Sequence, residues 1–238
     1  MISDATETSG EWRPNILYRD EALLVLNKPA GLSVQDSPSS RGYFNLIREK
    51  LSLNEAYPVH RLDQGTSGIY LIALNRAAAS ALGHAFEHGH VEKIYLALSS
   101  AKGKKKQGWV IGDMVPARGG SYKLLPQRSH PAMTYFLGRS LKPGLRAMAL
   151  KLYTGKTHQA RVALKSVSAP ILGDARYGGQ SADRMYLHAA ALQLNWSGRV
   201  PVSLVCWPSP QEGVLWNGIE AVFSEGLLSS SLFPDRPV

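Results

Sequence analysis

The chain has 238 residues, of which 44% are hydrophobic and 19% are charged, and this is the composition of a globular protein and not of a disordered chain. Its single cysteine, Cys206, excludes an intramolecular disulfide and argues against a cysteine-based zinc site. The formal net charge of +9 favours a polyanionic partner, and nucleic acid is the first candidate.

Residues 1–14 are polar and are predicted to form a flexible tail. They lack the apolar stretch of a signal peptide, and no run in the chain approaches the roughly 18 apolar residues of a membrane span. We therefore expect a cytoplasmic protein. Residues 15–238 contain no internal repeat and no long linker, so they are predicted to form one domain.

The first half of the chain alternates between apolar strand patterns and helical patterns. The segment 28–31, Lys-Pro-Ala-Gly, is a turn signal, and 37–42 is predicted to be a loop. The predicted elements are a strand pair over 17–27, a short helix over 43–51, a buried strand over 68–74, a helix over 77–87 and a strand over 92–98.

The second half is predicted to contain more strands than helices. The strands are expected at 146–153, 186–196 and 202–207, the helices at 157–167 and 211–224, and a glycine-rich loop at 173–183. Thr154 or Thr157 is the expected N-cap of the first of these helices. Because strands and helices mix without a regular strand–helix–strand rhythm, the predicted fold class is α+β.

The most distinctive polar segment is 60–68, His-Arg-Leu-Asp-Gln-Gly-Thr-Ser-Gly, directly before the buried strand. A carboxylate held on a turn at a strand end, such as that of Asp63, suits a nucleophile or a general base. The same pattern is compatible with a purely structural role, in which Asp63 caps the turn and Thr66 and Ser67 donate hydrogen bonds to it.

Two further segments carry candidate functional side chains. Lys156, His158 and Arg161 lie at the predicted start of a helix, where cations and free backbone N–H groups attract anions. Lys93 and Tyr95 share one face of the predicted strand 92–98, so Tyr95 is expected to face a polar cleft. A solvated basic face and a half-buried strand tyrosine are the structural alternatives.

Taken together, these segments resemble the RluA family of RNA pseudouridine synthases. The family signature is His-Arg-Leu-Asp, two free positions and Thr-Ser-Gly, and residues 60–68 match it at every fixed position. The other segments that resemble family motifs, in the same order along the chain, are 27–32, 93–97, 154–162, 170–178 and 187–189. The resemblance spans roughly residues 15–210.

The chain departs from the family pattern at two places. Lys156 stands where arginine is usual, which keeps the charge but loses the planar fork of a guanidinium, and Ala163 stands where histidine is common. Only about 14 residues precede the first matched segment, so an N-terminal S4 RNA-binding domain does not fit, and the chain resembles the single-domain members of the family.

The resemblance implies a pseudouridine synthase fold, with a mixed and mostly antiparallel central sheet, flanking helices and loops, and a catalytic cleft across the sheet. It implies an isomerase of the intramolecular transferase class that converts uridine in tRNA or 23S rRNA to pseudouridine without a cofactor or a metal. Asp63 corresponds to the catalytic carboxylate, Arg161 to the arginine that pairs with it, and Tyr95 to the tyrosine at the base.

The remaining candidates are expected to bind the substrate. Arg61, Lys93, Lys156 and His158 are the expected RNA contacts, and Leu187 is the expected apolar wall of the cleft. The resemblance therefore implies RNA as the partner, and we expect a monomer. The alternatives are an RNA-acting hydrolase or N-glycosylase that uses the same aspartate, and a catalytically silent RNA-binding module.

Overall fold

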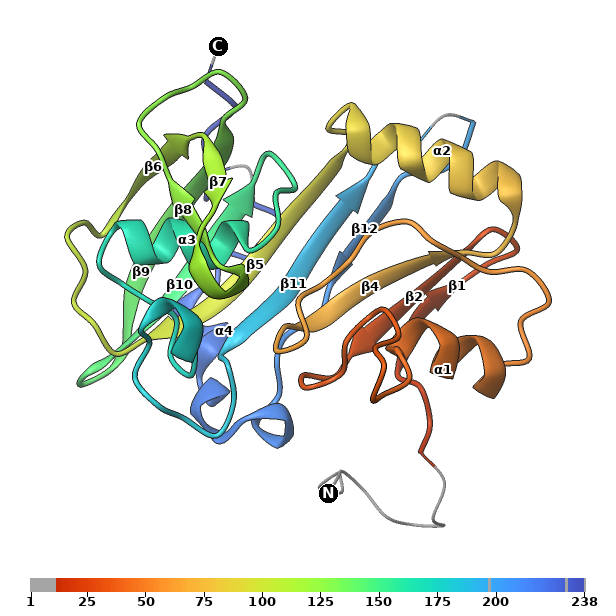
Figure 1. Ribbon diagram of the computed structural model, residues 1–238, viewed down its shortest axis with the longest axis horizontal. Helices are drawn as coiled ribbons and strands as arrows, with labels where there is room; N and C mark the ends of the chain where they lie inside the picture. The colour runs from red at the N-terminus through yellow and green to blue at the C-terminus, as the bar shows by residue number, and fades with distance from the viewer. Residues whose placement is uncertain (1–11, 197, 230, 238) are drawn as a thin grey trace.

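The computed structural model describes residues 12–196, 198–229 and 231–237, and one large sheet runs through it (Figure 1). In spatial order its strands are β1 (Ile16–Arg19), β2 (Leu23–Lys28), β4 (Ser67–Ala73), β11 (Leu187–Leu194), β5 (Val91–Ser99), β10 (Leu145–Leu152), β9 (Ala132–Lys142) and β6 (Gln107–Gly112). Two further strands pair beside this path, β3 (Tyr57–Pro58) with β4 and β12 (Val202–Val205) with β11. Among the described pairs of the sheet, β4 with β11 is parallel and the others are antiparallel.

In the β1–β4 half of the sheet, the two faces are covered by different helices. Because side chains alternate along a strand, Leu23 and Val25 of β2 pack with α2 (Arg76–Glu87). Leu24 and Leu26 point to the other face and pack with α1 (Tyr43–Lys50). The strand pair, both helices and the buried strand β4 agree with the sequence predictions.

The other half of the sheet is covered in the same two-sided way. On one face, Ala97 and Leu150 pack with α3 (Gln159–Ser166). On the opposite face, Leu96 and Leu98 pack with the C-terminal segment that contains α4 (Ile219–Val222). Tyr95 packs against the apolar residues around α1 and also against those around α3, so these two helices cover the same face of the sheet.

The parallel contact between β4 and β11 is where the two halves of the sheet meet. Ser67 lies opposite His188, and Gly68 lies opposite Ala189. A Cβ atom on Gly68 would come within 2.3 Å of the carbonyl oxygen of Ala189, and Gly68 has a φ of +106°. This close approach explains the glycine at the second residue of β4.

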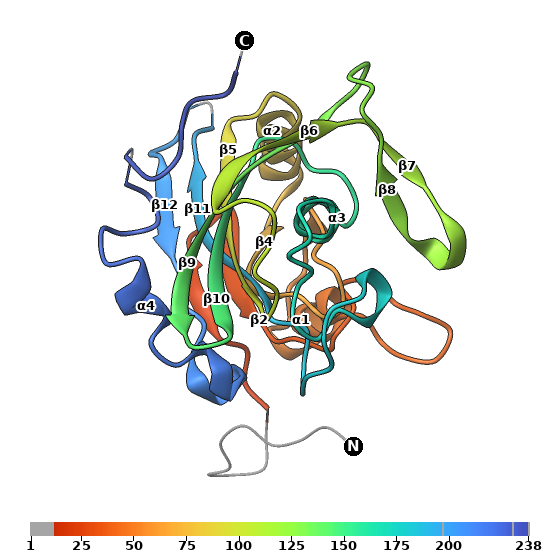
Figure 2. The ribbon, with the colours of Figure 1, turned by 90° about the vertical axis from the view of Figure 1, so that its left-hand side faces the viewer.

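A hairpin projects from the sheet on the side of α3 (Figure 2). It consists of β7 (Met114–Pro116) and β8 (Tyr122–Leu124), joined by a 3-10 turn over Arg118–Gly120. Its tip contacts the 3-10 turn Ala175–Tyr177, because Arg176 donates a hydrogen bond to the carbonyl of Gly119. The strands between 107 and 142 and this hairpin have no counterpart in the sequence predictions.

Two predicted helices differ from those observed. The helix predicted at 157–167 begins at Gln159, because His158 has a left-handed backbone with φ of 58°. Neither Thr154 nor Thr157 is its N-cap, and the Thr154 hydroxyl donates instead to the Gln159 side chain at 2.7 Å. The closing helix predicted over 211–224 is replaced by 3-10 turns and the short α4, since Gly218 has φ of 81°.

The predicted flexible tail falls mostly on residues 1–11, which lie outside the described residues. Trp12, at its end, packs edge-on against Tyr43 of α1, with 6.2 Å between the ring centroids. In the part of the chain that the structure describes, no helix is both long and apolar enough to cross a membrane. The α+β class with a mixed, mostly antiparallel sheet is confirmed.

Candidate active site

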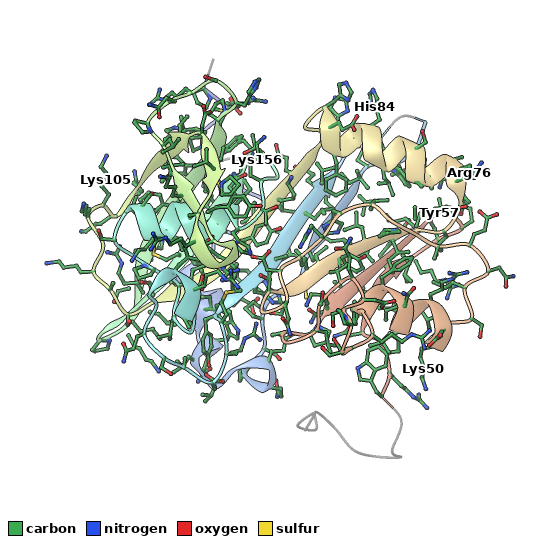
Figure 3. All side chains as sticks on the ribbon, in the orientation of Figure 1. Lys50, Tyr57, Arg76, His84, Lys105 and Lys156 are labelled. Atoms are coloured by element: carbon green, nitrogen blue, oxygen red, sulfur yellow. The ribbon has the colours of Figure 1, made fainter. Side chains whose placement is uncertain are left out.

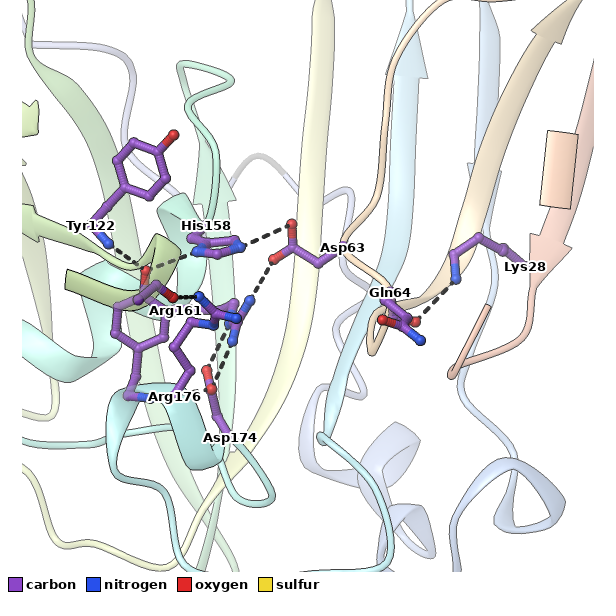
Figure 4. Close-up of polar contacts among 10 residues, drawn as sticks. Lys28, Asp63, Gln64, Tyr122, His158, Arg161, Asp174 and Arg176 are labelled. Carbon is purple, nitrogen blue, oxygen red and sulfur yellow. Dashed lines mark hydrogen bonds and ion pairs between the residues drawn. The ribbon is translucent and has the colours of Figure 1, made fainter. Parts of the chain in front are cut away.

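A cavity of about 570 Å³ brings Asp63 of the 60–68 segment together with His158 and Arg161 of the 154–162 segment. It is lined by Gly31, Ser33, Val34, Gln35, Arg61, Leu62, Asp63, Gln64, Gly65, His158, Arg161, Gly173, Asp174, Ala175, Arg176 and Met185. Figure 4 shows Asp63 between His158 and Arg161 on one side and the Gln64 loop and Lys28 on the other.

Asp63 lies in the turn that leads into β4. The backbone carbonyl of Asp63 accepts the N–H of Thr66 at 3.0 Å, so the main chain closes this turn. The carboxylate is not needed as a cap and faces the cavity, with 17% of the side chain exposed. The structural alternative, in which the carboxylate caps the turn, is therefore wrong.

Arg161 joins Asp63 to a second carboxylate. Its Nη1 donates to Asp63 Oδ2 at 3.2 Å, while Nε and Nη2 donate to Asp174 at 2.8 Å each. Burial opposes the positive charge of Arg161, but the hydrogen bonds and charges of Asp174 and then of Asp63 outweigh it, so the pKa of the guanidinium is raised. The arginine is thus a permanent cation with a fixed direction.

His158 reaches the other oxygen of Asp63. Its Nε2 lies 3.9 Å from Asp63 Oδ1, and its Nδ1 lies 2.9 Å from the hydroxyl of Tyr177. Burial lowers the pKa of His158 below its ordinary value, although the charge of Asp63 acts in the opposite direction. At neutral pH the imidazole is therefore neutral.

Tyr95 of β5 is half-buried between the apolar residues around α1 and those around α3. Burial first, and then the negative charge of Asp63, raise the pKa of its hydroxyl above the ordinary value. The phenol is therefore protonated at neutral pH and lies within the electric field of Asp63. Tyr95 is not among the cavity-lining residues named above, so its place in one site with Asp63 stays a prediction.

His60, the first residue of the 60–68 segment, has a structural role. His60 Nε2 accepts the backbone N–H of Leu71 in β4 at 2.9 Å, and its ring stacks on Phe86 of α2. Burial lowers the pKa of His60 to about 3, so the ring stays neutral and can keep this acceptor. His60 thereby ties the loop that carries Asp63 to the sheet.

The other predicted binding residues surround the site at different depths. Arg61 is exposed and lines the cavity, and Lys156 is exposed on the α3 side of the molecule (Figure 3). Lys93 is half-buried, with its ammonium 5.5 Å from the centre of the Phe86 ring, and burial lowers its pKa. Leu187 is 2% exposed and packs in the core with Ala97, and it is not among the cavity-lining residues named above.

Sequence reasoning missed the role of Lys28. Its ammonium is fully buried and donates to the carbonyl oxygens of Pro29 and Leu32 at 2.7 and 2.8 Å, and to that of Gln64 at 3.5 Å. Burial lowers the pKa of Lys28 to about 7, with the nearby Arg184 adding to this shift and Asp63 opposing it. The Lys-Pro-Ala-Gly turn thus supports the loop next to Asp63. The signal in the sequence was a lysine at the end of an apolar strand, a place where a buried charged side chain needs polar partners.

A buried polar network at the junction of β4 and β11 was also missed. Ser67 accepts a hydrogen bond from Arg184 Nη2 at 2.7 Å and contacts His188 Nδ1 at 2.8 Å. His188 Nε2 contacts the carbonyl of Cys206 at 2.9 Å, and burial lowers the His188 pKa to about 4. Ser67 and His188 both belong to segments that the sequence analysis had singled out, but only their tertiary contact reveals this role.

Comparison with known proteins gives a consistent result. A model of the family described as RNA pseudouridylate synthase matches residues 22–166. The chain is 41% identical to an uncharacterized RNA pseudouridine synthase of Haemophilus influenzae, over 84% of this chain and 89% of that one.

Relatives with named RNA targets are more distant. The chain is 31% identical to tRNA pseudouridine synthase C of Pectobacterium carotovorum, over 86% of this chain. It is 33% identical to ribosomal large subunit pseudouridine synthase C of Rickettsia bellii, over 76% of this chain. The match spans 63% of the length of each of these two relatives.

A solved structure has the same fold. Human RNA pseudouridylate synthase domain containing 1 superposes with a TM-score of 0.71 and 25% sequence identity, over 86% of this chain and 87% of that one.

Proposed function

The chain belongs to the RNA pseudouridylate synthase family, and from this premise we propose that Asp63 is the carboxylate that acts on the target uridine. The reaction is an isomerisation, in which uracil leaves C1′ of the ribose, rotates and is joined again through C5. The observation that carries the proposal is the position of Asp63 in a cavity, held by an arginine that is itself fixed by Asp174.

Arg161 is proposed to keep Asp63 ionised and correctly aimed. Transfer of a carboxylate from water into a closed site disfavours its charged form, and a neighbouring cation opposes this effect. Arg161 supplies that cation at 3.2 Å and is only 10% exposed, so solvent screens the pair weakly. The pair orients one oxygen of Asp63 before the substrate arrives.

Tyr95 is proposed to stack on the flipped uracil and to assist the removal of the C5 proton. Its raised pKa, due to burial and to Asp63, keeps the phenol protonated in the free enzyme.

The proposed substrate is tRNA or ribosomal RNA. Its support is the net charge of +9 and the RNA targets in the names of the two relatives from Pectobacterium and Rickettsia. A stacked uridine must be flipped out at a cost of a few kcal/mol, which is smallest in loops and bulges. Arg61, Lys93 and Lys156 are proposed to offset this cost through phosphate contacts, with His158 as a further substrate contact. Leu187, expected from the sequence as a wall of the cleft, is buried in the core and is therefore not proposed as a substrate contact.

The remaining features of the proposal concern the whole protein. We propose that residues 15–238 act as one catalytic domain, as a monomer in the cytoplasm. The support is a sheet that is continuous from β1 to β6 and a site built from both of its halves. Size-exclusion chromatography with light scattering tests the monomer, and a mass near 52 kDa, twice the 26.0 kDa of the chain, would contradict it.

The experiment that tests Asp63 is its replacement by asparagine. Asp63→Asn is expected to abolish pseudouridine formation in tRNA and ribosomal RNA transcripts while RNA binding survives. Asp235→Asn, at an exposed position outside the cavity, is the matched control and should be fully active. Continued isomerisation by Asp63→Asn would remove the central assignment.

The same assay separates the isomerase from the alternative enzymes. An isomerase leaves the length and the mass of the RNA unchanged. A hydrolase would shorten the RNA, and an N-glycosylase would release uracil. Mapping of pseudouridine across the transcriptome, with and without the gene, would identify the target uridine.

A further inference from the structure

A chain of polar contacts leads from the β7–β8 hairpin to Asp63 (Figure 4). The backbone N–H of Tyr122 donates to the hydroxyl oxygen of Tyr177 at 2.9 Å. That hydroxyl lies 2.9 Å from His158 Nδ1, and His158 Nε2 lies 3.9 Å from Asp63 Oδ1. The hairpin and the carboxylate are thus linked by two side chains, those of Tyr177 and His158.

The positions of the hydrogens in this chain follow from counting donors and acceptors. The phenol of Tyr177 has one hydrogen and already accepts the N–H of Tyr122. If it donates that hydrogen to His158 Nδ1, the neutral imidazole carries its own hydrogen on Nε2. The other tautomer would point the lone pair of Nε2 at a carboxylate oxygen, which is repulsive. Both ends of the chain therefore favour the Nε2–H tautomer.

We propose that His158 is a positioning residue for Asp63, held by Tyr177 as the Nε2–H tautomer so that this N–H is directed at Asp63 Oδ1. The inference rests on the proposed function of Asp63 and deepens it. Arg161 fixes Oδ2 through Nη1 at 3.2 Å, and His158 faces Oδ1, so each oxygen has its own donor. The 3.9 Å separation is longer than a hydrogen bond, and catalytic contacts of this kind shorten when the substrate closes the site.

The surroundings of His158 hold the ring in this orientation. Its ring makes edge-to-face contacts with Tyr122 and Tyr177, each with 5.7 Å between the centroids. Its backbone is left-handed, with φ of 58°, at the N-cap of α3. The charged groups that face it are Asp63, Asp174, Arg161 and Arg176. Burial and the two arginines lower its pKa more than the two carboxylates raise it, which agrees with a neutral ring.

The tautomer is tested directly by nitrogen NMR of the full-length protein labelled with ¹⁵N-histidine. The signals of His158 are assigned by their loss in His158→Gln. We expect the wild type to carry its hydrogen on Nε2, and we expect Tyr177→Phe to lose this preference and to titrate at a higher pH. A wild-type ring with its hydrogen on Nδ1 would overturn the proposal. Tyr135→Phe, on the strand β9 outside the cavity, is the matched control and should leave His158 unchanged.

The substitutions His158→Gln and His158→Asn separate the positioning of Asp63 by the side chain from the effect of the left-handed backbone at residue 158. The amide nitrogen of glutamine takes the place of Nε2, whereas that of asparagine takes the place of Nδ1 and leaves Asp63 without a donor. Asparagine, however, tolerates a left-handed backbone better than glutamine does. We expect His158→Asn to lower kcat about 10- to 100-fold with little change in KM, and His158→Gln to recover most of that loss. If His158→Asn is the more active of the two, the role of His158 is in the backbone and the proposal is wrong.

The outcome for Asp63 is read separately. If Asp63→Asn isomerises uridine, the proposed function fails whatever the histidine variants do. If Asp63→Asn is inactive while His158→Asn and Tyr177→Phe retain the rate and the pH profile of the wild type, only the positioning role of His158 fails.

Discussion

Arg161 binds Asp174 more extensively than it binds Asp63. Two nitrogens of Arg161 donate to Asp174 at 2.8 Å each, whereas one donates to Asp63 at 3.2 Å. The side chain of Asp174 is 1% exposed, so it holds the guanidinium in a fixed position. Asp63 accepts a hydrogen bond from the remaining nitrogen, Nη1. The direction of the proposed catalytic carboxylate therefore depends on a residue that lies on another loop.

The first prediction concerns Asp174. Asp174→Asn leaves a buried arginine with a single carboxylate and places an amide group against its donors. We expect the free energy of unfolding to fall by about 3 kcal/mol, which is typical of a broken buried ion pair. We also expect kcat to fall about 100-fold because Arg161 no longer holds its direction. Urea denaturation and single-turnover rates measure the two effects, and an unchanged rate would make Asp174 purely structural.

The second prediction concerns the shape of the cation. Arg161→Lys keeps a positive charge but cannot donate to Asp174 through two nitrogens and to Asp63 through a third. We expect a loss in kcat of about 100-fold or more. Arg139→Lys is the matched control, because Arg139 pairs with Glu225 outside the cavity and should tolerate the change. Equal activity of both variants would show that charge alone is sufficient at Arg161.

The third prediction concerns the pH dependence of stability. Burial lowers the pKa of Lys28 from 10.5 to about 7, so between these values the unfolded chain binds more protons than the folded chain does. The contribution of Lys28 to the free energy of unfolding therefore rises with pH, by about 2 kcal/mol from about pH 7 to about pH 9. Lys28→Met removes this titration. Urea denaturation of both proteins across this range should give curves that diverge, and parallel curves would contradict the assignment.

The fourth prediction concerns the RNA surface. RNA binding is expected to weaken steeply with salt, because contacts with phosphates release counterions. Lys156→Gln should weaken binding for all substrate sequences and reduce the slope of log K against log salt by about one. Lys142→Gln, at the last residue of β9, is the matched control and should keep the wild-type slope. Filter binding at several salt concentrations measures both slopes.

Local patterns in the sequence predicted most of the elements that carry the site. The continuous apolar run of β4 is visible in the sequence because both faces of this strand are buried. The alternation along β5 is visible because successive side chains point to opposite faces of the sheet. The start of α3 was misplaced by two residues, since the left-handed backbone of His158 depends on its tertiary contacts. The hairpin β7–β8 was missed because its short strands carry no long apolar pattern.

The partners of the site residues were less predictable than the residues themselves. Asp63, Arg161 and Tyr95 were found through the family resemblance, and the structure brings Asp63 and Arg161 into direct contact. The sequence placed Lys28 in a turn and Asp174 in a glycine-rich loop, but it did not predict their contacts. The contacts that join them to the site are with residues that are distant in the sequence. A carboxylate that fixes an arginine is indistinguishable in sequence from a carboxylate that caps a turn.

The contact between Asp63 and Arg161 has a consequence for how activity first appears in a newly made chain. The two residues are 98 positions apart, and they come from opposite sides of the β4–β11 junction. Because β11 lies between β4 and β5 in the sheet, a ribosome must finish the chain through β11 before the carboxylate meets its cation. Chains that stall or are cleaved between these residues carry the 60–68 segment but no oriented carboxylate. The proposed catalytic carboxylate is thus aligned only late in the synthesis of the chain.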